Sequence, residues 1–194
     1  MSWKRPSRIH SVHERTGVSW KRTGRELLHK GPFLSLYRDS VIRPDGSAGT
    51  YEHVITKDSV RVAAIDEEGS ILLVEDDFYL QERGILHLPG GGVEDDFVCA
   101  AAERELEEET GMKAGKLHDL ATIEPLPGIT AARVHLFAAT DLKPGQINRD
   151  STEINMTVKR WPLGVAIDAV QSGKITEGGS VAAILLTAAY LGRR

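Results

Sequence analysis

Pro89-Gly-Gly-Gly-Val-Glu-Asp-Asp-Phe-Val-Cys-Ala-Ala-Ala-Glu-Arg-Glu-Leu-Glu-Glu-Glu-Thr-Gly-Met112 is the stretch of the chain that decides its fold. It begins with a run of three glycines, which lets the backbone come close to a neighbouring strand or to a ligand. Residues 97–110 predict a helix that stops at Gly111, because glycine accepts the left-handed conformation that closes a helix. The stretch therefore predicts a glycine-rich loop followed by a helix.

Three glutamates share one side of this predicted helix. Glu105 and Glu109 are four residues apart and Glu108 follows Glu105 by three, so their side chains project from the same face. Like charges at this spacing destabilise a helix, so the carboxylates are either solvated or share a cation. Mg²⁺, with Mn²⁺ as a substitute, prefers carboxylate oxygens together with substrate phosphates and water. The loop and the helix together could supply such a site.

The spacing of the whole stretch resembles the Nudix box. In that motif a glycine is followed after five residues by a glutamate, and after seven more by Arg-Glu-apolar-any-Glu-Glu-any-Gly-apolar. This chain follows the pattern from Gly90 to Met112, with Asp96 in place of the first glutamate. The resemblance implies an α/β fold of Nudix type, in which an α/β/α sandwich surrounds a mixed β-sheet. It also implies metal-dependent hydrolysis of the pyrophosphate bond in a nucleoside diphosphate compound.

The resemblance implies roles for individual residues as well. Glu105 and Glu109 would be the principal Mg²⁺ ligands, with Glu108 as a further ligand or an acid–base group. The carbonyl of Gly90 would complete the coordination, and Arg104 would orient the glutamates through ion pairs. The residues expected to bind substrate are Gly91, Gly92, Asp96, Pro127 and Gly128.

Signatures outside the motif are similar to the ADP-ribose pyrophosphatase branch of the Nudix family. Residues 31–37 and 43–46 are similar to its N-terminal β module, and residues 125–128 to the loop after the box. The likeness implies ADP-ribose or a related nucleotide sugar as substrate. It also implies a homodimer that exchanges the β module; the alternative is that the module packs on its own domain.

A catalytic base is expected at Glu153, in the region where this branch carries a mobile acidic loop. A carboxylate there could deprotonate or position the attacking water once the loop closes. The alternative is an ordinary exposed loop acid.

The rest of the chain predicts a basic leader at residues 1–22, an N-terminal β module at 23–57 and the hydrolase domain at 58–194. Apolar runs at 60–65 and 71–74 predict a hairpin. Ser180 is expected to cap the last helix. Strands are expected at 33–37, 51–55, 86–88, 120–124, 134–139 and 154–161, and helices at 163–171 and 180–191. Because strands and helices do not alternate regularly, they favour a mixed sheet between helices over a doubly wound parallel sheet.

Composition limits the classes of function. The chain has 194 residues, a net charge of −4 and one cysteine, Cys99, so it forms no intramolecular disulfide and has no general attraction to nucleic acid. The first 30 residues are basic, which leaves a mobile leader or an RNA contact as alternatives. No segment resembles an export signal or reaches the ~20 apolar residues that span a bilayer. A cytoplasmic location without a membrane partner is expected.

Two hypotheses for function remain from the sequence. The first is an enzyme that cleaves a small nucleotide substrate with Mg²⁺ or Mn²⁺. The second is a module of the same fold that binds a nucleotide without cleaving it, which the aspartate at position 96 and the alanines at 131 and 132 favour. The complete set of Arg104, Glu105, Glu108 and Glu109 favours the enzyme.

Overall fold

The computed structural model describes residues 19–94, 97–149 and 153–192. The helices in these ranges are α1 (Val98–Thr110), α2 (Leu163–Gln171) and α3 (Gly178–Leu191). The strands are β1 (Lys21–Lys30), β2 (Leu34–Ile42), β3 (Ala48–Thr56), β4 (Ser59–Ala64), β5 (Ser70–Phe78), β6 (Arg83–His87), β7 (Met112–Lys113), β8 (Lys116–Ile123), β9 (Val134–Thr140), β10 (Lys143–Pro144) and β11 (Thr157–Pro162).

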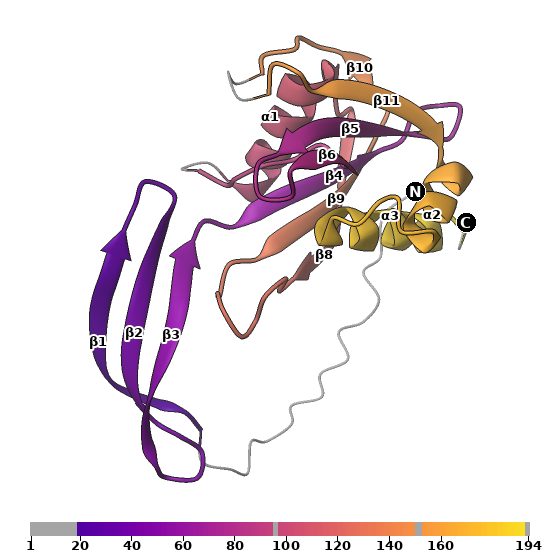
Figure 1. The fold of residues 1–194 in the computed structure, drawn as a ribbon. Helices are drawn as coiled ribbons and strands as arrows, with labels where there is room; N and C mark the ends of the chain where they lie inside the picture. The colour runs from indigo at the N-terminus through magenta and orange to yellow at the C-terminus, as the bar shows by residue number, and fades with distance from the viewer. Residues whose placement is uncertain (1–18, 95–96, 150–152, 193–194) are drawn as a thin grey trace.

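The three N-terminal strands form an antiparallel sheet in the order β1-β2-β3. The turn between β2 and β3 contains Pro44-Asp45-Gly46, and Gly46 has a φ of 84°, which glycine adopts without strain. Strand β1 was not predicted, because most of its side chains are exposed and it lacks an apolar alternation. It begins at Lys21, inside the stretch assigned to the leader, and residues 1–18 of that leader lie outside the described residues. Figure 1 shows this sheet projecting from the rest of the protein, to which β3 connects it.

The main domain contains two three-stranded sheets. One has the order β4-β9-β8, in which β4 runs parallel to β9 and β8 runs antiparallel to it. The other is antiparallel, with the order β11-β5-β6. The predicted hairpin between residues 60–65 and 71–74 is wrong, because β4 and β5 enter different sheets and share only an isolated bridge between Ile65 and Ile71. The expected mixed sheet is confirmed.

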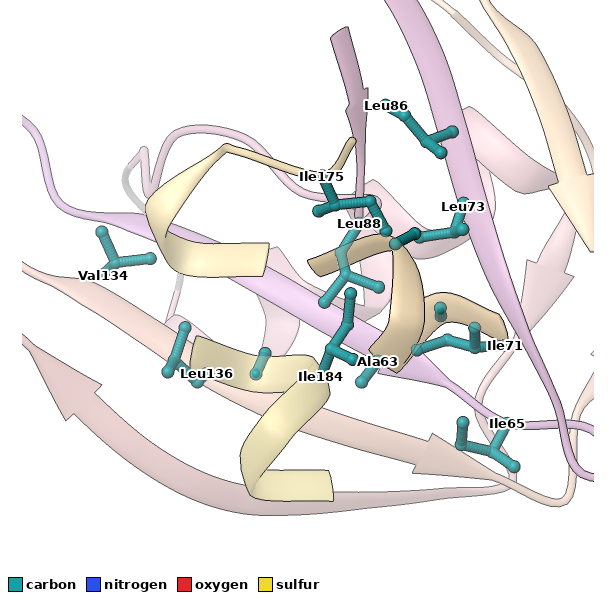
Figure 2. Close-up of a cluster of buried hydrophobic side chains, with 13 residues drawn as sticks. Ala63, Ile65, Ile71, Leu73, Leu86, Leu88, Val134, Leu136, Ile175 and Ile184 are labelled. Atoms are coloured by element: carbon teal, nitrogen blue, oxygen red, sulfur yellow. The ribbon is translucent and has the colours of Figure 1, made fainter. Parts of the chain in front are cut away.

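Strand β4 is buried on both faces, which makes it the centre of the domain. Val60 and Val62 pack in one apolar cluster with residues of α1, including Leu106. Ala63 points the other way, into a second cluster that contains Ile184 of α3 (Figure 2). Helices therefore cover opposite faces of this sheet, and the expected α/β/α sandwich is confirmed.

The helix ends follow from local chemistry. Gly111 closes α1 with a φ of 71°, and its N–H donates to the carbonyl of Glu107, as expected of a left-handed cap. The prediction that Ser180 caps α3 is wrong. Glu177 is the N-cap, because its longer side chain accepts hydrogen bonds from the N–H groups of both Gly179 and Ser180. The helix consequently begins at Gly178, two residues earlier than expected.

No helix among residues 19–94, 97–149 and 153–192 is long and apolar enough to cross a membrane. Cys99, at the start of α1, is exposed and forms no disulfide.

Candidate metal and catalytic site

The glycine loop lies directly along strand β4. The N–H of Val62 donates to the carbonyl of Pro89, and the N–H of Val60 donates to that of Gly91, each at 2.9 Å. Between them Gly90 has a φ of 149°, and a Cβ built on it would lie 2.1 Å from the carbonyl oxygen of Val60. Only glycine can occupy this position without moving the loop or the strand.

The loop also fixes the space around the glutamates of α1. A Cβ at Gly91 would lie 2.5 Å from Oε1 of Glu105, so the missing side chain is what makes room for that carboxylate. The N–H of Gly90 donates to Oε2 of Glu109 at 3.1 Å. The backbone of the loop and the carboxylates of the helix thus form one local structure.

Two of the three glutamates are buried. Glu105 is 8% exposed and Glu109 is 2% exposed. Burial raises the pKa of Glu109 to about 8, and the charges of Glu105 and Glu153 add to the effect; the hydrogen bond from Gly90 and the charge of Arg61 oppose it. Burial also raises the pKa of Glu105, against the opposing charge of Arg104. Burial makes ionisation of these two carboxyl groups unfavourable, and a bound cation would offset that cost.

Arg104 is the positive group that contacts Glu105 and Glu108. Its Nη1 lies 3.0 Å from Oε1 of Glu105 and 3.0 Å from Oε2 of Glu108, and its Nη2 donates to the carbonyl of Gly92 at 3.2 Å. It therefore joins two of the glutamates to the loop.

The residues present fit a hard divalent cation in their chemistry. Carboxylate oxygens and a loop carbonyl are the ligands that Mg²⁺ and Mn²⁺ prefer, and the carboxyl group of Glu109 has no cationic partner at hydrogen-bonding distance among the described residues. Within the described ranges no three His, Cys, Asp or Glu side chains are already arranged as a metal cage. Glu105 and Glu108 instead form ion pairs with Arg104. The three glutamates would therefore form a complete set of metal ligands only around a bound cation.

A cavity of about 400 Å³ opens next to the glutamates. Glu105, Glu108 and Arg104 line it from α1, Gly91 and Gly92 line it from the loop, and Glu94 and Glu153 complete its wall. Glu153 comes from a segment distant in sequence, yet its charge contributes to the raised pKa values of both Glu105 and Glu109. The volume of this cavity suits a site for a small molecule.

Arg149 was missed by the sequence analysis. Its Nη2 donates to the carbonyl of Glu109 at 2.9 Å, and its Nη1 donates to the carbonyl of Met156. It therefore ties the C-terminal end of α1 to the segment that carries Glu153. Nothing in the sequence around position 149 marks such a role, because the contact joins residues 40 positions apart.

The remaining predicted residues are not all in this place. Pro127 and Gly128 line a different cavity, of about 280 Å³, together with Tyr51 and His53 of the N-terminal sheet. The hydroxyl of Tyr51 donates to the carbonyl of Gly128 at 2.8 Å. Asp96 lies outside the described residues.

The fold and this site define a class of hydrolase, and comparison with known proteins names it. The model of the NUDIX domain matches residues 56–171, and that of the nucleoside diphosphate sugar hydrolase N-terminal domain matches residues 20–54. The chain belongs to the Nudix hydrolase family.

Known relatives span most of the chain. It is 31% identical over 163 residues to an ADP-ribose pyrophosphatase of Mycobacterium tuberculosis, covering 82% of this chain and 79% of the relative. It is also 31% identical over 169 residues to an ADP-ribose pyrophosphatase of Bacillus subtilis, covering 84% and 90%. The crystal structure of an ADP compounds hydrolase superposes with a TM-score of 0.81 at 22% identity, covering 90% of this chain and 95% of that one. This last likeness concerns the fold alone.

Proposed function

We propose that the protein hydrolyses the pyrophosphate bond of a nucleoside diphosphate linked to a second group. The observation that supports this proposal most directly is the buried pair Glu105 and Glu109 against the glycine loop, in a chain of the Nudix family. Arg104 and Glu108 lie beside this pair. Water attacks one phosphorus atom and the bridging P–O bond breaks. The products are a nucleoside monophosphate and a phosphorylated remainder.

Each group has a distinct part in this proposal. Glu105, Glu109 and Glu108, with the carbonyl of Gly90, would hold Mg²⁺ or Mn²⁺. Bound there, the cation supplies neutralisation of the pyrophosphate charge and a lower pKa for a coordinated water. Arg104 keeps the carboxylates in position through its two ion pairs.

Glu153 is the proposed general base. It lines the same cavity as Glu105 and Glu108, and its charge helps to raise the pKa of Glu109. A carboxylate at this place can take the proton of the attacking water, a contribution of typically 10²–10⁴-fold to the rate.

The proposed substrate is ADP-ribose or a related nucleotide sugar. The match of residues 20–54 to the N-terminal domain of nucleoside diphosphate sugar hydrolases and the names of the two relatives support it. Gly91 and Gly92 line the carboxylate cavity and would contact the phosphates, together with Asp96. Pro127 and Gly128 would contact a more distant part of the substrate from the second cavity.

A homodimer is part of the proposal. The N-terminal sheet projects from the domain (Figure 1), and it exposes apolar side chains that a second copy could cover. These are Leu27, Leu34 and Ile55 on the strands and Phe33 in the turn between β1 and β2, where Phe33 is 85% exposed. The contact of Tyr51 with Gly128 supports the alternative, in which the sheet packs on its own domain. Sedimentation equilibrium distinguishes a dimer from a monomer.

The test of the function is a panel of ADP-ribose, other nucleoside diphosphate sugars and dinucleotides, incubated with Mg²⁺ or Mn²⁺. We expect metal-dependent release of a nucleoside monophosphate, lost in Glu109→Gln. Glu103→Gln is the matched control, because Glu103 lies on the same helix but is exposed. If a compound binds and none is cleaved, the protein is a nucleotide-binding module and the enzyme proposal is wrong.

A further inference from the structure

The N-terminal end of α3 reaches the glycine loop through a chain of buried and partly buried polar contacts. Oε2 of Glu177 accepts hydrogen bonds from the N–H and the hydroxyl of Ser180, at 2.7 and 2.6 Å. The hydroxyl oxygen of Ser180 in turn accepts the N–H of Leu88 at 2.8 Å. Leu88 directly precedes the Pro89-Gly90 peptide, so this chain of contacts ends at the loop of the proposed metal site.

The direction of these hydrogen bonds is fixed by charge. Burial raises the pKa of Glu177, but the charge of Arg61 and hydrogen bonds from Ser180 outweigh it and lower that pKa to about 2. Glu177 is therefore an anion at neutral pH and accepts only. A serine hydroxyl has one proton, which it donates in the hydrogen bond to this anion, so a lone pair of Ser180 is left to accept the N–H of Leu88.

Arg61 closes the network onto the strand beneath the loop. Its Nε donates to Oε2 of Glu177 at 3.1 Å, and its Nη1 donates to the carbonyl of Val60 at 2.8 Å. That carbonyl is the one against which Gly90 rests without room for a Cβ. The loop is thus held from β4 on one side and from α3 on the other.

We propose that Ser180, oriented by Glu177 and Arg61, is a positioning residue that sets the Leu88–Gly90 backbone so that Gly90 faces Glu109. The proposal rests on the hydrolase function proposed above. Ser180 lies outside the residues matched by the NUDIX domain model, which ends at position 171. Ser180 is 0% exposed, and its hydroxyl is the acceptor for the buried N–H of Leu88, so removing the hydroxyl takes away the acceptor of a buried donor.

Ser180→Ala removes the acceptor of Leu88 and one donor to Glu177. A loosened loop offers the Gly90 peptide less often in the right place, and loss of an outer partner of a metal site typically costs 10–100-fold in metal affinity or activity. We expect Mn²⁺ affinity, measured by electron paramagnetic resonance without substrate, to fall about tenfold or more. We expect kcat to fall similarly at saturating Mg²⁺, with the substrate KM within about twofold of the wild type.

Two further variants make this test specific. Thr187→Val removes another buried hydroxyl from α3, one with no hydrogen-bond partner among the described residues, and should leave Mn²⁺ affinity and kcat unchanged. Ser180→Thr keeps the hydroxyl and should restore most of the loss. Hydrogen exchange of the metal-free protein supplies a readout independent of turnover: the Leu88 and Gly90 amides should exchange faster in Ser180→Ala and not in Thr187→Val.

The outcomes separate this proposal from the proposed function. If Ser180→Ala only lowers the melting temperature and leaves Mn²⁺ affinity, kcat and loop exchange as in the wild type, Ser180 is merely structural and the proposal is overturned. If the wild type cleaves nothing in the panel, yet Ser180→Ala binds Mn²⁺ more weakly and loses loop protection, the positioning role stands while the hydrolase function fails.

Discussion

Ionisation of Glu109 should make the metal-free protein less stable as the pH rises. The carboxyl group has a pKa of about 8 in the folded protein, against an ordinary value of 4.5. Below pH 4.5 it is protonated in both states and costs nothing. Between pH 4.5 and 8 the unfolded chain loses a proton that the folded protein keeps, so the free energy of unfolding falls; above pH 8 the effect is complete.

The size of the effect follows from the shift. A difference of about 3.5 pKa units, at ~1.4 kcal/mol for each unit, gives a loss of at most about 5 kcal/mol by pH 8. Since small domains are stable by ~5–15 kcal/mol, a loss of this order is readily measured. Glu109→Gln removes this titrating group and should make this part of the pH profile less steep.

The assay is urea unfolding in EDTA at a series of pH values from 5 to 8.5, followed by tryptophan fluorescence. We expect Glu109→Gln to be more stable than the wild type by several kcal/mol at pH 8 and similar to it near pH 5. Glu103→Gln, on the exposed side of α1, should follow the wild type throughout. Replacing the EDTA with Mn²⁺ at pH 8 should restore stability to the wild type and not to Glu109→Gln. Parallel profiles for the wild type and Glu109→Gln would refute the reasoning.

Three further predictions concern the loop and the base. Gly90→Ala places a methyl group 2.1 Å from the carbonyl oxygen of Val60, so Mn²⁺ affinity and kcat should both fall ~100-fold or more. The methyl group of Gly92→Ala meets no atom within 4 Å, so this variant should keep its Mn²⁺ affinity. Equal losses of Mn²⁺ affinity in the two variants would show that the close approach of Gly90 to Val60 does not matter. Glu153→Gln should lower kcat by ~10²–10⁴ with little change in Mn²⁺ affinity, as measured by turnover and paramagnetic resonance, and an unchanged kcat would exclude it as the base. Arg149→Met should lower kcat roughly tenfold and speed hydrogen exchange across residues 153–156, because it unties that segment from α1; wild-type exchange there would contradict it.

Local sequence was enough to predict the helix that carries the candidate site. The helix was expected at residues 97–110 and is found at Val98–Thr110, closed by Gly111 as expected. Both features depend on residues within a few positions of each other, and the glutamate spacing sets one helix face by geometry alone. That these glutamates hold a metal stays a prediction.

Contacts between distant segments could not be predicted in the same way. Strand β1 has no apolar alternation to reveal it, and the pairing of β4 with β9 depends on the whole fold rather than on either segment. Arg149 and Ser180 contact the site through hydrogen bonds to backbone groups of distant residues, which leave no trace in local sequence. The second cavity at Pro127 and Gly128 depends on where the N-terminal sheet lies, which the sequence leaves open.

The hydrogen bond from Leu88 to Ser180 joins residues 92 positions apart, and this has a consequence for how the protein is made. A ribosome adds ~5–20 residues per second, so roughly 5–20 s pass between synthesis of the loop and synthesis of its support. For most of that interval the nascent chain contains the whole of α1 with its glutamates, but not the Ser180 hydroxyl of α3 that accepts a hydrogen bond from Leu88. A chain whose translation stops before α3 therefore carries a complete motif on an unfinished site.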